Sequence, residues 1–261
     1  MDIQLAGKHF YISGVSEGMG RSIAEFLVAE GAFVHGCARS RSALGVLRES
    51  LAESVRAVAH LDALDVLDAD ALKASVEGVG SAVGRLDGIV ACAGVGVSGR
   101  VLDTLNEGWR QQFDIKVVGV LNLVRPALPW LRRARDPRIV IINGVTAHHP
   151  DLSMAAVSAS RAATASLGRS LAEELAGEVT VNTVNVGAIN TSRQTARWES
   201  SRSGISFEAW EARESARRGI LVGRFGRPQE VAALVTFLVS PLAGYLSGSS
   251  IDVAGGSHGR P

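Results

Sequence analysis

The chain has 261 residues, of which 46% are hydrophobic and 20% are charged, proportions typical of a globular protein large enough to bury a core. Its 27 Lys and Arg residues nearly balance its 26 Asp and Glu residues, so the formal net charge is +1. This balance excludes a strongly basic protein, so we expect neither a nucleic acid nor an anionic membrane as a partner.

The N-terminal stretch MDIQLAGKHF lacks the basic and apolar regions of an export signal, and no apolar run in the chain reaches membrane-spanning length. The two cysteines, Cys37 and Cys92, are far apart and lie in apolar runs, which favours buried free thiols. No Cys-x-x-Cys pair or Cys/His spacing indicates a metal site. We therefore expect a soluble cytoplasmic protein without a metal.

Apolar, strand-like runs alternate with longer helix-like segments along the chain. The first run, residues 8–14, is followed by residues 21–31, whose apolar positions recur at helical spacing and end on Gly31. Further strand-like runs, separated by helical segments, lie at residues 32–38, 55–62, 88–94, 138–144, 179–186 and 249–256. This alternation predicts an α/β fold of the Rossmann type, a doubly wound parallel sheet of about seven strands with helices on both faces. The nearly continuous apolar strands agree with a sheet buried on both sides.

No linker, low-complexity tract or internal repeat divides the sequence, so we expect residues 1–261 to form a single domain. The least regular segment is residues 190–223, which lies before the last strand pair and contains a charged stretch. This segment is either a lid over a substrate or a plain solvated helical arm, and the sequence leaves both interpretations open.

A glycine-rich turn, SGVSEGMG at residues 13–20, follows the first strand and opens the first helix. Gly14, Gly18 and Gly20 allow a tight turn and the close approach of a pyrophosphate to backbone N–H groups at the helix start. A glycine-rich turn alone is weak support, because many turns need glycine. Its position between the first strand and the first helix favours a dinucleotide site.

Together with later motifs, this turn resembles the short-chain dehydrogenase/reductase family, and the resemblance covers essentially the whole chain. The turn is similar to the family's T-G-x3-G-x-G, with Ser13 in place of the threonine. The segment ACAG, residues 91–94, stands where the family has N-N-A-G beside the adenosine ribose, and Asp65 resembles the acidic residue at the adenine ring. The segment VNTVNVGAINT, residues 181–191, is similar to V-N-x-V-x-P-G-x-I-x-T, whose final threonine contacts the nicotinamide amide.

The resemblance implies a set of residues that bind a nicotinamide dinucleotide. This set is Ser13, Gly14, Ser16, Gly18, Met19, Gly20, Arg39, Asp65, Ala91, Ala93, Gly94, Arg161, Ile189 and Thr191. The C-terminal run, residues 223–256, is very close to the family's last helix and last strand, which also form a subunit interface. The resemblance therefore implies a homodimer or homotetramer.

The form of the dinucleotide depends on residues near the second strand. Arg39 follows that strand, where a guanidinium could pair with a 2′-phosphate, and no acidic residue ends the strand to hold a free ribose 2′-hydroxyl. Glu17 points the other way, because family members that prefer NADP often have a basic residue in the glycine turn. We expect NADP; the alternatives are that Arg39 is a solvated surface arginine, or that no dinucleotide binds.

The resemblance also identifies four positions that perform the family's carbonyl chemistry, and other residues occupy all four in this chain. Lys116 stands in place of an asparagine that holds a relay water, and Gly144 in place of a serine that hydrogen-bonds the carbonyl. Val157 stands in place of the proton-donating tyrosine, and Arg161 in place of the lysine that lowers the tyrosine's pKa and grips the nicotinamide ribose. Arg161 can still reach the ribose, but its guanidinium stays charged and cannot shuttle a proton.

A shifted alignment does not restore the tyrosine, because the chain has only Tyr11, in the first strand, and Tyr245, in the C-terminal run. A positioned general acid is worth about 10²–10⁴ in rate and one donor to a developing oxyanion about 10²–10³, although such contributions need not multiply. We therefore expect very slow hydride transfer to an unactivated ketone.

The loop that follows Gly144 contains residues that could replace the missing groups. In this fold the loop leads to the helix of Val157, which brings His148, His149 and Asp151 near the expected reacting carbon. Imidazole suits general acid–base chemistry near neutral pH. The alternative is that the two histidines are ordinary loop residues and Asp151 caps the next helix.

Lys116 is a second candidate, because its position lies deep against the predicted sheet. A desolvated ammonium has a lowered pKa and can act as an acid, a base or an amine nucleophile. The alternative is an inward-facing lysine paired with a carboxylate such as Asp114.

Three classes of function agree with these residues. The first is an oxidoreductase that transfers hydride to an activated substrate, with His148 or Lys116 supplying the proton. The second is a non-redox enzyme (dehydratase, isomerase, cyclase or lyase) on the same scaffold, and the third is a non-catalytic subunit. Small or apolar residues are expected around the substrate and favour a hydrophobic molecule. These residues are Val157, Gly144, Val145 and Met154.

Overall fold

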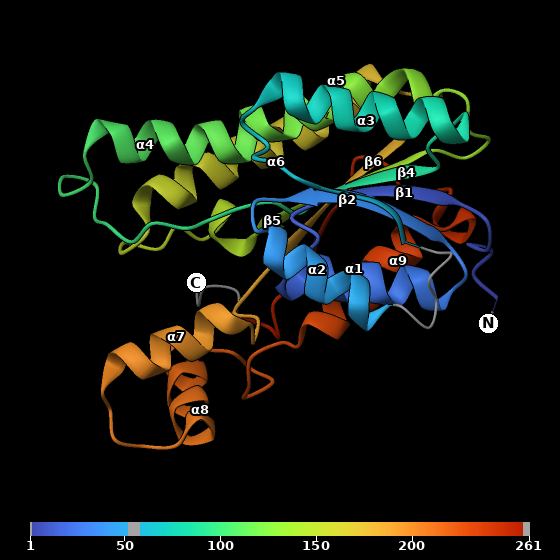
Figure 1. Cartoon of the computed structure of the whole chain (residues 1–261). Coiled ribbons are helices and arrows are strands. Elements are labelled where there is room, and N and C mark those ends of the chain that lie inside the picture. Colours follow the sequence, from blue (N-terminus) through green and yellow to red (C-terminus); the bar gives the residue numbers. More distant parts are fainter. Residues whose placement is uncertain (1, 52–57, 258–261) are drawn as a thin grey trace.

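The computed structural model describes residues 2–51 and 58–257, and within them a seven-stranded parallel sheet forms the centre of the molecule (Figure 1). The strands are β1 (His9–Ser13), β2 (Phe33–Ala38), β3 (Val58–Ala63), β4 (Gly88–Ala91), β5 (Arg138–Gly144), β6 (Thr180–Val186) and β7 (Ser250–Val253). Their order is β3-β2-β1-β4-β5-β6-β7, and each pair of neighbours is parallel. The predicted doubly wound sheet is therefore confirmed. Residues 55–57 of the predicted third run lie outside the described residues.

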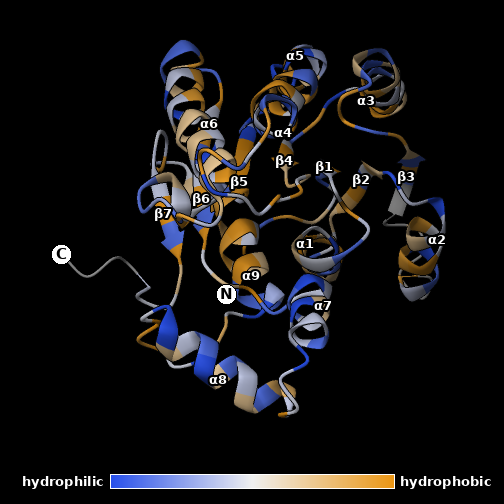
Figure 2. Cartoon of the chain, turned by 90° about the vertical axis from the view of Figure 1, so that its left-hand side faces the viewer, coloured by the Kyte–Doolittle hydropathy of each residue, from blue (hydrophilic) through white to orange (hydrophobic). Residues whose placement is uncertain are grey.

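Helices cover both faces of this sheet (Figure 2). They are α1 (Gly18–Ala29), α2 (Arg41–Ser50), α3 (Ala69–Val83), α4 (Asn106–Phe113), α5 (Gly119–Leu131), α6 (Ala155–Glu174), α7 (Ser192–Ser201), α8 (Phe207–Arg217) and α9 (Pro228–Leu238). One core cluster packs α1, α2 and α9 against the sheet, and a second packs α3, α5 and α6 against the opposite face. None of the described helices combines the length and apolar character needed to span a membrane.

The chain reverses its direction across the sheet between β1 and β4. It runs from β1 outward to β2 and β3, and then returns to place β4 on the other side of β1. Connections leave such neighbouring strands in opposite directions, which opens a crevice at the strands' carboxyl ends. The glycine turn after β1 and the segment after β4 therefore meet at this crevice.

Residues 190–223, the least regular part of the sequence, form α7, α8 and their connections. Figure 1 shows these two helices extending away from the layers that cover the sheet. Their own small core consists of aromatic and aliphatic side chains, with Trp198 edge-on to Phe207 and Trp210 edge-on to Phe225. This core makes the segment a packed helical pair rather than an irregular loop.

Candidate functional site

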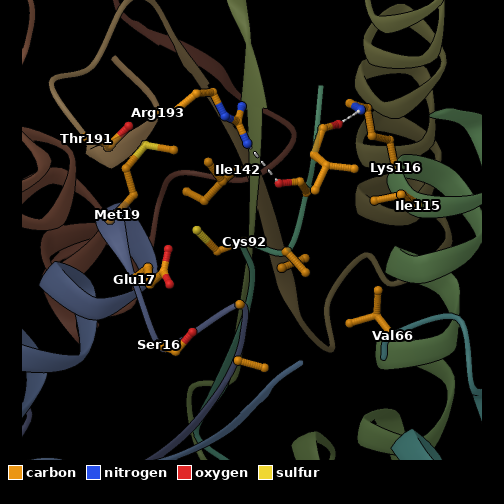
Figure 3. Close-up of a pocket in the computed structure, with 18 of the residues that line it drawn as sticks. Ser16, Glu17, Met19, Val66, Cys92, Ile115, Lys116, Ile142, Thr191 and Arg193 are labelled. Atoms are coloured by element: carbon orange, nitrogen blue, oxygen red, sulfur yellow. Dashed lines mark hydrogen bonds between the residues drawn. The ribbon is translucent and has the colours of Figure 1, made fainter. Parts of the chain in front are cut away.

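A cavity of about 660 Å³ opens at the carboxyl ends of the central strands (Figure 3). Most residues expected to bind a dinucleotide line it. They are Gly14, Ser16, Gly18, Met19, Gly20, Arg39, Asp65, Ala91, Ala93, Gly94, Arg161, Ile189 and Thr191. These residues come from widely separated parts of the sequence, so the fold brings them together around one space.

The glycine turn has no room for side chains at its two most crowded positions. Gly14 has φ +74°, and a β-carbon there would lie 2.8 Å from Ala93 Cα. A β-carbon on Gly20 would lie 2.1 Å from the carbonyl oxygen of Gly14. Helix α1 begins immediately at this turn, and its N-cap Glu17 makes no side-chain capping hydrogen bond with a described residue. The turn therefore presents backbone N–H groups to the cavity, and it fits a pyrophosphate.

Ser13 is the one expected cofactor residue that does not line the cavity. It is buried, and its hydroxyl accepts hydrogen bonds from the backbone N–H groups of Cys92, at 3.2 Å, and Ala93, at 3.3 Å. These bonds hold the end of β1 against the segment after β4. Ser13 thus positions the turn, because its hydroxyl faces the backbone after β4 and not the cavity.

Arg39 follows β2 and lines the cavity with an exposed side chain. Among the residues that the structure describes, no ion pair or hydrogen bond holds its guanidinium. Asp65 lines the cavity as well, and one of its carboxylate oxygens accepts the backbone N–H of Leu67 at 3.0 Å. Glu17 is the second carboxylate in the lining. The free cation and the two carboxylates are all available to a ligand.

Lys116 lies on a π-helical segment, Asp114–Val118, that joins α4 to α5. Its ammonium donates hydrogen bonds to the carbonyl oxygen of Val95, at 2.7 Å, and to the side chain of Gln112. The suggested pairing with Asp114 is wrong, because the ammonium points into the cavity, toward Val95. Burial, followed by the charges of Arg161 and Arg193, lowers the pKa of Lys116 to about 7.

Arg161 lies on α6, and its guanidinium covers Gly144 at the end of β5. A β-carbon on Gly144 would lie 1.3 Å from Nη1 of Arg161, so a side chain at position 144 and this arginine conformation exclude each other. Burial and the charge of Arg193 lower the pKa of Arg161 to about 10, which leaves it charged at neutral pH.

Arg193, near the start of α7, is a lining residue that sequence reasoning missed. Its guanidinium donates to the carbonyl oxygen of Gly94 at 3.3 Å. Figure 3 shows Arg193 and Lys116 on opposite sides of the cavity, each hydrogen-bonded to the segment between them. The only signal in the sequence was the place of Arg193, two residues after Thr191, which ends a motif that already indicated a cofactor contact. We call Lys116, Arg161 and Arg193 the cation cluster.

The loop candidates His148, His149 and Asp151 are not among the residues that line the cavity. Nε2 of His148 lies 3.2 Å from Nδ2 of Asn185 on β6, so this imidazole faces the sheet edge near β7. Asp151 accepts the backbone N–H of Ser153 at 2.8 Å and its hydroxyl at 2.7 Å. The structure therefore does not bring these three residues together with Lys116. Asp151 instead caps a turn before α6.

The two tyrosines also lie away from this site. Tyr11 is fully buried and its hydroxyl hydrogen-bonds that of Ser75 at 2.6 Å, while Tyr245 is fully exposed. Val157 is fully buried on α6, and neither it nor Met154 lines the cavity. Both approach Gly96, whose β-carbon would lie 3.2 Å from Met154 and 3.9 Å from Val157.

Comparison with known proteins extends this picture. The family model described as Enoyl-(Acyl carrier protein) reductase matches residues 14–258. The 2,3-dihydro-2,3-dihydroxybenzoate dehydrogenase of Escherichia coli (strain K12) is 31% identical over 261 residues, and the match covers 98% of each chain.

Two solved structures are similar over almost the whole chain. One is an NADPH-bound short chain oxidoreductase from Pseudomonas aeruginosa PAO1, described as containing an atypical catalytic center; it is 32% identical, with a TM-score of 0.91, over 97% of this chain and 98% of that one. The other is L-sorbose reductase from Gluconobacter frateurii, complexed with NADPH and L-sorbose; it is 28% identical, with a TM-score of 0.93, over 98% of each chain. With the parallel sheet, the glycine turn and these matches, the chain belongs to the short-chain dehydrogenase/reductase family of oxidoreductases.

Proposed function

We propose that this chain is a nicotinamide-dependent oxidoreductase that prefers NADP(H) and acts on a small molecule with an apolar body. The observation that carries this proposal is the cavity itself, which joins the tightly packed glycine turn to Lys116 and Arg161 in one space. When bound, the nicotinamide supplies the hydride. The protein's own residues must then hold the two ligands, exclude water and move a proton.

The cofactor assignment rests on the fit of the lining residues. The turn at Gly14 and Gly20 would receive the pyrophosphate, Asp65 the adenine end, and Thr191 the nicotinamide end. Arg161 has several N–H donors within the same space, so that ribose hydroxyls can take some of them and leave others for a second ligand. The two similar structures described above were solved with NADPH, which supports the same class of cofactor here.

The preference for NADP(H) rests on Arg39. Its guanidinium is free of described partners at the end of β2, where a 2′-phosphate would need a positive charge. A guanidinium pairs with phosphate through two parallel hydrogen bonds, which favours the phosphorylated form over NAD(H).

We further propose that the family's proton-donating machinery is replaced. Gly144 and Val157 bring no hydroxyl to the site, so neither can polarise or protonate a carbonyl oxygen. Lys116 is the best remaining proton donor, because its ammonium borders the cavity and its pKa of about 7 makes it acidic enough to give up a proton near neutral pH. Loss of the hydroxyl donors favours an activated substrate.

Residues 190–223 serve as the lid in this proposal. The start of α7 already borders the cavity through Thr191, Arg193 and Ala196, and α8 packs on α7 through the aromatic core. A movement of this helical pair would open or close the cavity as one unit. Val95, Ile115 and Ile189 are apolar residues that line the cavity, and they would contact the substrate's apolar body.

The C-terminal run supports the proposal of a homodimer or homotetramer. Phe237, Leu242 and Tyr245 are exposed hydrophobic residues close together in the sequence, and solvent-exposed apolar clusters of this kind mark association surfaces. Light scattering should give the mass of two or four chains, and a mass of one chain would contradict this.

The function is tested by titrating the purified protein with NADPH and with NADH while following nicotinamide fluorescence. NADPH should bind at least about tenfold more tightly, a difference of roughly 1.4 kcal/mol, and Arg39→Gln should remove that preference. Arg48→Gln is the matched control, because Arg48 is an exposed arginine on α2 that does not line the cavity. Failure of both nucleotides to bind would overturn the proposed function.

A further inference from the structure

The cation cluster brings three positive side chains from three different elements around one part of the cavity, with Lys116 and Arg193 on opposite sides of it (Figure 3). Lys116 comes from the π-helical segment, Arg161 from α6 and Arg193 from the start of α7. Each lies close enough to shift the proton affinity of a neighbour, since Arg193 lowers the pKa of both other residues. The segment after β4 holds two of them in place through its carbonyl groups.

No described carboxylate neutralises this cluster, and none of its members takes part in an ion pair within residues 2–51 and 58–257. The two carboxylates in the cavity lining, Glu17 and Asp65, come from the turn before α1 and the segment after β3. Lys116 and Arg161 are half-buried and Arg193 is exposed, and like charges held close together destabilise one another unless an opposite charge joins them. The cluster is therefore short of an anion.

The guanidinium of Arg161 occupies a space beside Gly144, and no described residue accepts a hydrogen bond from it there. Gly144 leaves the space beneath it open, since any side chain at that position would collide with Nη1. Among the described residues, no hydrogen-bond acceptor meets this guanidinium, and the arginine is half-buried at the cavity wall. A planar guanidinium with free donors matches a carboxylate, which it binds through two parallel hydrogen bonds.

We propose that the cation cluster binds a carboxylate of the substrate. This inference rests on the proposed function and adds the substrate's chemical class, an apolar molecule that carries an acid group. The site differs from the expected pyrophosphate site, because its charged residues come from the π-helical segment, α6 and the start of α7, whereas the glycine turn follows β1. Two anion sites in one cavity let the cofactor and an acidic substrate bind side by side.

The test is a calorimetric titration of the NADPH-saturated protein with sodium benzoate and with benzamide, at constant ionic strength. Benzamide has the same ring and no charge, so it isolates the contribution of the carboxylate. Benzoate should bind at least about tenfold more tightly than benzamide. It should also cause proton uptake near pH 7, because a carboxylate beside Lys116, Arg161 and Arg193 raises the pKa of Lys116 from about 7.

Single variants identify the residues responsible. Lys116→Gln, Arg161→Gln and Arg193→Gln should each weaken benzoate about tenfold and leave benzamide unchanged, and Lys116→Gln should abolish the proton uptake. Arg169→Gln is the matched control, since Arg169 lies on the same α6, is exposed and pairs with Glu173. It should change neither ligand. Arg161→Lys, which keeps the charge, guards against a loss that arises only from misfolding.

The outcomes separate this inference from the proposed function. If NADPH binds but benzoate binds no better than benzamide, the carboxylate site is wrong and the cofactor assignment stands. If benzoate displaces NADPH, the cluster serves a cofactor phosphate and the inference is overturned. If NADPH does not bind at all, the proposed function fails and the titration is made on the free protein, where selective benzoate binding that the three variants weaken would still support the anion site.

Discussion

The two ends of the cavity that we propose to bind anions differ in construction, one being formed by backbone and the other by side chains. At the glycine turn, the close packing of Gly14 and Gly20 brings backbone N–H groups at the start of α1 to the cavity, while the N–H of Gly14 itself donates to the carbonyl oxygen of Cys37. At the other end, Lys116, Arg161 and Arg193 supply the charge through long side chains. A site made of backbone depends on shape, whereas a site made of side chains changes its chemistry with single substitutions. One scaffold can therefore keep its dinucleotide and alter its reaction.

The largest effect on cofactor binding is expected when one methyl group is added to the glycine turn. In Gly20→Ala the new β-carbon would lie 2.1 Å from the carbonyl oxygen of Gly14, so the turn must move. NADPH affinity should fall by at least about 100-fold, roughly 2.7 kcal/mol. Gly78→Ala is the matched control: Gly78 is also helical and its β-carbon would meet nothing within 4 Å. Fluorescence titration gives both affinities, and similar values for the two variants would contradict the account.

The partly buried charge of Lys116 in the cation cluster should lower the free energy of unfolding, and the size of this decrease should depend on pH. The folded pKa of Lys116 is about 7, below its ordinary value of 10.5, so the unfolded chain binds more protons between these values. The parent's stability should therefore rise with pH in that window, by up to about 1.4 kcal/mol per unit. Lys116→Met lacks this pH-dependent contribution. We expect its free energy of unfolding to exceed that of the parent at pH 7, and this difference should shrink between pH 7 and pH 9.

Urea unfolding at the two pH values measures this difference. Lys73→Met is the control, because Lys73 is an exposed lysine of α3 and forms only a surface pair with Glu77. Its difference from the parent should stay constant with pH. Parallel curves for Lys116→Met and Lys73→Met would show that Lys116 keeps an ordinary pKa.

A smaller change sharpens the comparison at the cation end. Gly144→Ser returns the residue type that the family resemblance expects, but the new side chain would occupy the space of the Arg161 guanidinium. Benzoate affinity should fall about tenfold although no charge is removed. Gly45→Ser is the control, since a β-carbon on this glycine of α2 meets nothing within 4 Å. An unchanged benzoate affinity in Gly144→Ser would mean that benzoate binding does not depend on this position of the Arg161 guanidinium.

The smallest effect is expected in the loop after β5. His148→Ala and Asp151→Asn should change NADPH and benzoate affinity by less than about twofold, because both residues have partners away from the cavity. The same titrations check this. A loss of tenfold or more in either variant would move the chemical end of the site to that loop.

The sheet and the glycine turn could be predicted because local patterns specify them. Continuous apolar runs separated by helical segments identify the fold class, and the strand order then follows from the fold class. Gly14 and Gly20 mark a tight turn in which a side chain would collide with the backbone. The lining residues of the cofactor end followed from this turn, from the later family motifs and from the place of Arg39; Ser13 was the exception. Its hydroxyl bonds Cys92 and Ala93, which are distant in the sequence.

The cation end was only partly predictable. Lys116 was a candidate because of its position, but its bond to the carbonyl of Val95 depends on how the π-helical segment packs. Arg193 meets Gly94 only because α7 folds back toward the end of β4. The sequence also could not predict that a side chain at position 144 would collide with Arg161. The residue types alone do not indicate which side chain fills the space beside Gly144.

The most direct test of the account is a crystal structure of the protein grown with NADPH and benzoate. The account predicts the pyrophosphate on the N–H groups of the turn at residues 14–20, and the benzoate carboxylate on the guanidinium of Arg161, near Lys116 and Arg193. A cofactor phosphate seated on Arg161, or a glycine turn that holds no part of the dinucleotide, would contradict it.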